Sequence, residues 1–277
     1  MRTGFFAAQK LDTPIHKLSG LTKLLGFLIL TGAVMFSYDL RVILCVMVFS
    51  FIVLRISKIT FSQIKLMVIY VLVFLAINAL LTFVFSPGYG TEIYGTRHVI
   101  LELFGKYDVT SETLFFILTK FTKYASVIPL GMIFLLTTDP SELASSLNAV
   151  GVHYKIAFAF SLTLRYFPDI QRDYRDISQA QQARGLEMSN KAKLWDRFKR
   201  GLSIILPLIL STLDRIETIT NAMDLRGFGK YKKRTWYSRR KLGRGDVIAL
   251  VISVLILLTT VAISVFINHG RFYNPFI

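Results

Sequence analysis

Two arginine–glycine pairs are the residues of this sequence whose type and spacing point to a chemical task. Arg184-Gly185 follows Ala183, and Arg226-Gly227 stands 42 residues further along the chain. The guanidinium group of arginine binds carboxylates and carbonyl oxygens through paired hydrogen bonds that lysine does not form. Glycine accepts the left-handed backbone conformation that ends many helices. We therefore predict two helix ends that each present an arginine, a pattern suited to docking another protein.

A single pair of this kind has a simpler structural explanation, because a cation near a helix C-terminus gains about 0.3–1 kcal/mol from the helix dipole. The repetition favours docking instead. Pro168 lies 17 residues before Gly185, and Pro207 lies 20 residues before Gly227. The difference is nearly one helical turn, so both copies keep a similar angle between proline and arginine. We expect both prolines to kink their helices.

The patterns of an enzyme or a metal centre are missing from the sequence. No G-x-x-x-x-G-K-[ST] loop occurs, so we do not expect this chain to bind ATP. The single cysteine, Cys45, lies inside an apolar run. The four histidines have no metal-ligand spacing, and we interpret them as interface or surface residues: His16, His98, His153 and His269. We expect no catalytic residue, no cofactor and no metal.

Apolar runs supply the elements that must position the two pairs. The chain is 53% hydrophobic with a mean hydropathy of +0.52, and a bilayer span needs about 20 residues. The runs are Leu21–Phe36, Leu40–Leu54, Ile64–Phe85, Leu114–Thr137 and Val247–Ile267. We predict five transmembrane helices, the first a retained span rather than a signal peptide and paired with the second in a tight hairpin. We expect Lys120 and Lys123 to reach one membrane edge from the fourth run.

Two long helices are predicted between the fourth and fifth runs, at 154–183 and 194–225. Each is about 45 Å long, apolar in one half and charged in the other, which suits a helix half in the bilayer and half out. The predicted fold is therefore all-α and polytopic, with about five spans and two kinked coupling helices. Its expected parts are membrane helices over 1–140, a coupling region over 141–245 and a last span over 246–277.

Loop charge predicts the orientation. Residues 165–246 carry 19 basic and 9 acidic residues, a net of +10 out of +16. Basic residues collect in cytoplasmic loops, which places this block and the N-terminus inside and the connection 86–112 outside. The run 230–244 interleaves aromatic and basic residues, a pattern found in nucleic-acid binding, but beside a span we favour lipid headgroups and expect no nucleic acid.

The sequence resembles the transmembrane (T) component of energy-coupling factor transporters, bacterial importers of the ABC type. The resemblance is strong over 138–229 and rests on Leu-Arg165-Tyr-Phe-Pro168, Gln181-Gln-Ala-Arg184-Gly185 and Ala222-Met-Asp-Leu-Arg226-Gly227-Phe228-Gly229. It departs from the family before the first span, where Ser19-Gly20-Leu21-Thr22-Lys23 replaces an Asp-Pro-Arg-x-Lys-like stretch.

The resemblance implies a non-catalytic subunit of the bacterial plasma membrane that takes part in vitamin or metal-ion uptake. It implies that Arg184 and Arg226 contact two cytoplasmic ABC ATPase subunits. It also implies that the apolar arms of the coupling helices hold a substrate-binding membrane (S) subunit. Two alternatives stay open: a stand-alone carrier that binds substrate between its own spans, and a membrane scaffold without ATPase partners.

Overall fold

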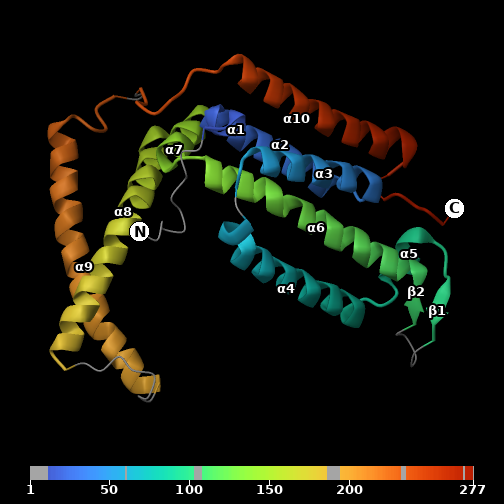
Figure 1. The fold of residues 1–277 in the computed structure, drawn as a ribbon, viewed down its shortest axis with the longest axis horizontal. Helices are drawn as coiled ribbons and strands as arrows, with labels where there is room; N and C mark the ends of the chain where they lie inside the picture. The colour runs from blue at the N-terminus through green and yellow to red at the C-terminus, as the bar shows by residue number, and fades with distance from the viewer. Residues whose placement is uncertain are drawn as a thin grey trace. The chain divides into compact units, whose positions relative to one another are not determined.

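A computed structural model describes residues 12–59, 61–102, 108–185, 194–231, 235–270 and 272–276. Their contacts divide the chain into two compact units (Figure 1). One unit runs to Asp139 and resumes at Arg240, and the other is Pro140–Arg239. The apolar runs belong to the first unit, and both arginine–glycine pairs belong to the second. Each unit is described by itself below.

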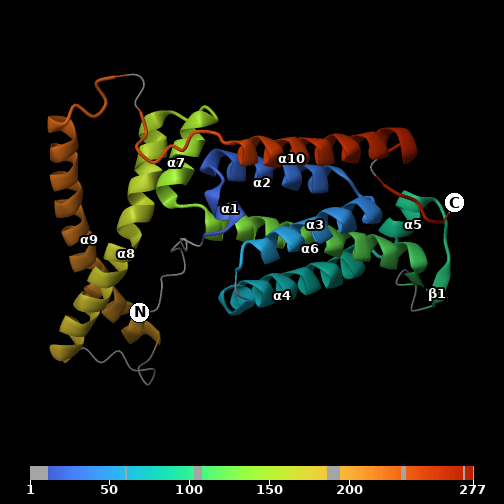
Figure 2. The same cartoon turned by 45° about the horizontal axis from the view of Figure 1, so that its top comes forward.

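The first unit is a bundle of helices that coincide with the five predicted runs. They are α2 (Gly20–Phe36), α3 (Leu40–Ile56), α4 (Phe61–Phe85), α6 (Ser111–Thr137) and α10 (Arg244–Ala262), which continues as a π-helical turn, η1 (Ile263–Ile267). A short α1 (Pro14–Lys17) precedes α2. Helix α6 contacts α2, α3 and α4, while α10 packs along α2 (Figures 1 and 2). The helical prediction for these runs is confirmed.

Length and composition support fewer spans than the five predicted. Among the described residues, Met67–Phe85 of α4 and Arg244–Ile267 of α10 and η1 are long and apolar enough to cross a membrane. Helix α6 qualifies only together with α7 (Pro140–Ala149), which would make a third span. Helix α2 is apolar but has 17 residues. The count of five therefore stays a prediction.

Side chains from three helices form the core of the first unit. Leu30 and Val34 of α2 meet Val46 of α3 and Leu130 of α6, and all four are buried. Burying a side chain of this kind contributes roughly 1.5–3 kcal/mol when the alternative is water. In a membrane the alternative is lipid, so close packing rather than water exclusion holds these helices together.

Two buried lysines join α2 and α6 at opposite ends. Lys23, in the first turn of α2, donates to the carbonyl of Thr137, the last residue of α6, at 2.6 Å. Lys123 of α6 donates to the carbonyl of Met35 in the last turn of α2 at 2.7 Å and lies 3.3 Å from the ring centroid of Tyr38. Each cation thus meets the negative end of the other helix dipole. The expectation that Lys123 snorkels is wrong, because only 2% of it is exposed.

The connection 86–112 contains structure that the all-α prediction missed. A short helix α5 (Tyr89–Tyr94) is followed by strands β1 (Val99–Leu101) and β2 (Val109–Thr110), which pair antiparallel. The strands are short and the apolar alternation is brief, so the sequence offers little signal for them. The chain after α10 packs against this end of the bundle: Phe272 stacks on Tyr38 at 4.6 Å between ring centroids.

His16 was expected to be an interface or a surface residue, and its burial shows that it is not at a surface. Its Nδ1 lies 2.6 Å from the hydroxyl of Thr13. Burial, and then the charge of Lys23, lower the pKa of His16 below its ordinary value. His16 is therefore part of the packing around the start of α2.

The second unit consists of α7, two long helices and the chain that follows them. The long helices are α8 (Tyr154–Ala183) and α9 (Leu194–Leu225), with the bounds predicted from sequence. Pro168 lies inside α8 and Pro207 inside α9. Helix α8 contacts both α7 and α9.

Candidate docking site

The first arginine–glycine pair ends α8 as a glycine-terminated helix cap. Arg184 is the C-cap residue, and its backbone N–H donates to carbonyls of the last turn. Gly185 has a φ of +88° and donates its N–H to the carbonyl of Gln182 at 3.0 Å. The predicted left-handed stop is confirmed here. Leu186, which completes this copy in the sequence, lies outside the described residues.

The second pair repeats this geometry at the end of α9. Gly227 has a φ of +66° and donates its N–H to the carbonyl of Asp224 at 2.9 Å, the equivalent of the Gly185–Gln182 bond. Phe228 donates to the carbonyl of Met223 at 2.9 Å. These two bonds are those of a Schellman motif, which satisfies carbonyls left open at a helix end. Both arginines therefore leave the helix from the same local backbone position.

The two arginines lie at opposite ends of the α8–α9 pair. Gln181 Nε2 contacts the Ser203 carbonyl, and Asp173 pairs with Arg215. Further back, Phe158 contacts Phe228. Residue numbers fall along α8 as they rise along α9, so the helices are antiparallel, and Figure 1 shows them crossing. The 26 residues between Phe158 and Arg184 correspond to about 39 Å of helix.

Aromatic packing anchors the second arginine–glycine pair. Phe228 packs on Phe158 and, edge to face, on Tyr154, with ring centroids 4.8 and 5.7 Å apart. Trp236 donates its indole N–H to Asn148 at 3.0 Å. The chain after Gly227 is thereby held against the first turns of α8 and the end of α7. The position of this helix end is thus determined by packing as well as by its cap.

Both arginines and residues beside them are exposed at the two helix ends. Ala183, Arg184, Gly185 and Arg226 are exposed. Leu225, directly before Arg226, is 90% exposed, which is unusual for a large apolar side chain. Sequence alone does not point to Leu225 as a docking residue, because a leucine late in an amphipathic helix ordinarily belongs to the packed face. Its position, matching Ala183 in the first copy, was the available signal.

The polar residues near the two helix ends differ in what they bind. Gln179, Asn221 and Asp224 are exposed, as expected for groups that add donors and acceptors to a docking surface. Gln181 and Gln182 instead form bonds within the unit, the latter to the Ser178 hydroxyl at 3.2 Å. Gln181 joins α8 to α9, whereas Gln182 bonds within α8 and stays exposed.

The Gln181 bond takes the place of a main-chain hydrogen bond that Pro207 cannot form. In a helix the N–H of residue i bonds the carbonyl of residue i−4, and proline has no N–H. Pro207 therefore cannot bond the carbonyl of Ser203. The side-chain amide of Gln181 donates to that carbonyl at 3.3 Å. The first arginine–glycine pair and the proline of the other helix are thus connected through a residue three positions before Arg184.

A family model described as cobalt transport protein, CbiQ, matches residues 12–237. The energy-coupling factor transporter transmembrane protein of Lactococcus lactis subsp. cremoris is 24% identical over 261 residues, 89% of this chain and 91% of the relative. The chain belongs to the energy-coupling factor T-component family.

Other relatives match a shorter part of this T component. The transmembrane protein of the same transporter type from Bacillus selenitireducens is 30% identical over 141 residues, 48% of this chain. That match covers 52% of the relative, so the chain spans about half of its length. A putative ABC transporter ATP-binding protein of Bifidobacterium longum is 29% identical over 167 residues, 57% of this chain and 21% of the relative.

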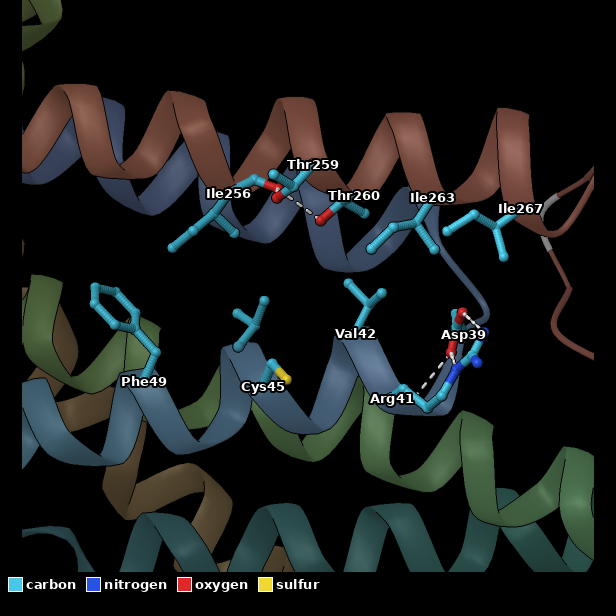
Figure 3. Close-up of a pocket in the computed structure, with 11 residues that line it drawn as sticks. Asp39, Arg41, Val42, Cys45, Phe49, Ile256, Thr259, Thr260, Ile263 and Ile267 are labelled. Carbon is cyan, nitrogen blue, oxygen red and sulfur yellow. Dashed lines mark hydrogen bonds and ion pairs between the residues drawn. The ribbon is translucent and has the colours of Figure 1, made fainter.

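A cavity between α3 and α10 of this T component is almost entirely apolar (Figure 3). It has a volume of about 460 Å³, and Asp39 and Arg41 lie at one end of it. Both Asp39 carboxylate oxygens accept bonds from Arg41, at 3.1 and 2.9 Å, and Asn268 donates at 2.9 Å. Burial raises the pKa of Asp39, but these bonds outweigh it and hold the pKa below its ordinary value. The charges of Asp39 and Arg41 are thus matched, and the free thiol of Cys45 also lines the cavity.

No group of three or more potential metal ligands occurs in the part of the chain that the structure describes. The residues predicted from sequence lie at two separate helix ends and do not form one centre. Such an arrangement can bind other proteins at two places.

Proposed function

We propose that this chain is the membrane subunit through which partner ATPases drive a substrate-binding membrane subunit during uptake of a vitamin or a metal ion. The observation that carries the proposal is the repeated helix end, with arginine at the C-cap and a left-handed glycine after it. The two copies stand about 39 Å apart along the helix pair. Two separate grooves are therefore needed, one on each of two ATPase subunits.

Each helix end binds by inserting into a groove of an ATPase. Arg184 and Arg226 supply charge-assisted hydrogen bonds, which are worth about 1.5–3 kcal/mol each. Leu225 adds an apolar anchor beside Arg226. Similarity to part of a protein named as an ATP-binding protein supports ATPase partners. The chain itself performs no chemistry.

The apolar side chains of α8 and α9 serve the second partner. Ile156, Leu206, Leu210 and Leu213 are each more than half exposed in the second unit. A surface of this kind is stable against lipid or another membrane protein rather than water. We assign it to the substrate-binding subunit and the bilayer. Region 141–245 and the N-terminus then lie on the cytoplasmic side, as the loop charges predict.

Alanine substitution at the two helix ends tests the proposal. Arg184→Ala and Arg226→Ala are each expected to weaken co-purification with the ATPase subunits roughly tenfold or more, and the double variant more than either. Uptake by cells falls in parallel. The control is Arg172→Ala, because Arg172 also lies on α8, its side chain is 72% exposed, and it pairs with Asp169 one turn away on the same helix.

Two results would contradict the proposal. One is a double variant that assembles with ATPases and supports uptake as well as Arg172→Ala does. The other is substrate uptake by the chain reconstituted alone in vesicles, which is the behaviour of a stand-alone carrier.

A further inference from the structure

A second cavity of the first unit lies between α4 and α6, where α4 ends and the connection 86–112 begins. Its volume is about 330 Å³. Four of its lining residues can donate or accept hydrogen bonds beside a lysine: Asn78, Thr82, Ser86 and Tyr89, with Lys120. The cavity thus gathers polar groups from α4, α5 and α6 in an otherwise apolar bundle.

Hydrogen bonding fixes the position of the Lys120 ammonium group. The Thr82 hydroxyl donates its one hydrogen to the carbonyl of Asn78 at 2.8 Å. It must therefore accept the bond from Lys120 Nζ, which lies 2.9 Å away. An ammonium group has three N–H donors, so two remain for other acceptors. Lys120 is partly exposed, and it lines the cavity.

Lys120 differs from two other cations of the bundle, Arg41 and Lys123, in the groups that accompany its charge. Arg41 is matched by the carboxylate of Asp39, and Lys123 is buried against a helix-end carbonyl. No carboxylate lines the Lys120 cavity in the part of the chain that the structure describes. A cation within a membrane-spanning helix is costly unless an anion or water accompanies it. The cavity is therefore electrostatically suited to an anion.

We propose that this cavity binds the phosphate group of an anionic membrane phospholipid. Lys120 and the Asn78 amide donate to the phosphate oxygens, and the Tyr89 hydroxyl closes the site. Thr82 lies within one turn of the end of α4, and the ends of a helix long enough to span a bilayer lie near the lipid headgroups. The acyl chains lie along the exposed side of α4, where Leu81 is 44% and Phe85 78% exposed. This site is independent of the arginine–glycine pairs and of their proposed role.

The identity of the lipid follows from the same charges. Phosphatidylethanolamine carries an ammonium group in addition to its phosphate, and the described lining has no carboxylate to receive it. Phosphatidylglycerol brings a net negative charge without that group. We therefore expect phosphatidylglycerol to bind more tightly than phosphatidylethanolamine.

Native mass spectrometry and thermal unfolding of the delipidated full chain test the site. Phosphatidylglycerol, phosphatidylethanolamine and inorganic phosphate are added separately to the chain in a neutral detergent. The expected result is retention of one phosphatidylglycerol molecule with a rise in the unfolding temperature. Lys120→Met is expected to weaken this binding roughly tenfold. Lys65→Met is the matched control, because Lys65 is an exposed lysine in the first turns of the same α4.

A second variant guards against misfolding of Lys120→Met. Asn78→Leu keeps the lysine and is expected to weaken phosphatidylglycerol binding several-fold. Stabilisation by the lipid but not by inorganic phosphate identifies the headgroup as the source of the anion. Stabilisation by inorganic phosphate as well supports a phosphate site that soluble anions also enter. The proposal is overturned if neither phosphatidylglycerol nor inorganic phosphate stabilises the chain. It is also overturned if Lys120→Met binds phosphatidylglycerol as tightly as the Lys65→Met control does.

Discussion

At the end of α9, the backbone of Gly227 decides the direction in which Arg226 leaves the helix. Its φ of +66° belongs to a conformation that costs other residues roughly 1–2 kcal/mol. The same conformation at Gly185 was predictable from sequence, because arginine before a stop glycine is a local pattern. The packing of Phe228 that holds the second helix end was not predictable, because its partners on α8 are about 70 residues earlier.

Gly227→Ala is expected to destabilise the chain by about 1 kcal/mol, since the strain outweighs the lower entropy of the unfolded chain. Gly201→Ala is the control: Gly201 lies inside α9, and an added Cβ meets nothing within 4 Å. That control is expected to stabilise by roughly 0.5–1 kcal/mol, because alanine favours helix. Thermal unfolding in detergent measures both. Equal effects of the two substitutions would show that the backbone of Gly227 carries no constraint.

Glu112 gives the connection 86–112 a dependence on pH. Its carboxylate is fully buried and accepts bonds from the His98 backbone, the His98 ring and the Thr96 hydroxyl. Burial acts to raise the pKa of Glu112, but the hydrogen bonds prevail and lower it from 4.5 to about 2. Such a shift corresponds to a stabilisation on the order of 3 kcal/mol.

This stabilisation is fully present above pH 4.5, where the carboxylate is ionised in both states. As the pH falls from 4.5 to about 2, the unfolded chain binds the proton first and the stabilisation is lost. Glu112→Gln is therefore expected to lower the unfolding temperature most above pH 5 and least near pH 2. Glu92→Gln, at an exposed position of the same connection, serves as the control. A difference between wild type and Glu112→Gln that stays constant with pH would contradict this explanation.

At the scale of helices, α8 and α9 are joined among their described residues by the Gln181–Ser203 and Asp173–Arg215 bonds, and the first of these lies at a proline. The helix bounds follow from local patterns: an apolar stretch, a charged stretch and a glycine stop. The pairing of Gln181 with Ser203 depends on how the two helices cross. The sequence therefore shows where Pro207 and Gln181 lie along their helices, but not that the Gln181 side chain bonds the Ser203 carbonyl.

A double-mutant cycle tests that connection. Gln181→Leu is expected to destabilise by about 1 kcal/mol, because the Ser203 carbonyl loses its side-chain donor. Pro207→Ala restores the main-chain N–H, so Gln181→Leu is expected to cost less in that background. The same cycle with Gln182→Leu, whose amide bonds Ser178 instead, should be additive. Additivity in the Gln181 cycle, measured by thermal unfolding, would mean that Pro207 and Gln181 act separately.

At the scale of the whole molecule, charge distribution predicts the orientation of both units in the membrane. The test is single-cysteine labelling of intact cells with an impermeant maleimide, in a Cys45→Ala background. Cysteines replacing Gln179 and Asn221 lie near the two helix ends without removing either arginine, and both positions are exposed. They are expected to react only after permeabilisation, while a cysteine replacing Glu92 reacts from outside. Labelling of positions 179 and 221 in intact cells would invert the proposed orientation.

Local interactions determined what could be read from the sequence alone. Helix bounds, left-handed glycines and the family pattern over 138–229 each depend on residues within a few turns of one another. The prediction of five spans also rests on local apolar runs, and the length and composition of the described helices support two or three of these spans.

Tertiary structure alone decided the features that join distant segments. These include the opposite placement of Arg184 and Arg226, the burial of Lys123 and the assembly of the Lys120 cavity from three elements. The strands of the 86–112 connection also belong here, because their pairing is set by chain contacts rather than by a run of alternating residues. The physical reason is shared: a side chain's partner across a helix pair depends on crossing and register, which no local stretch of sequence encodes.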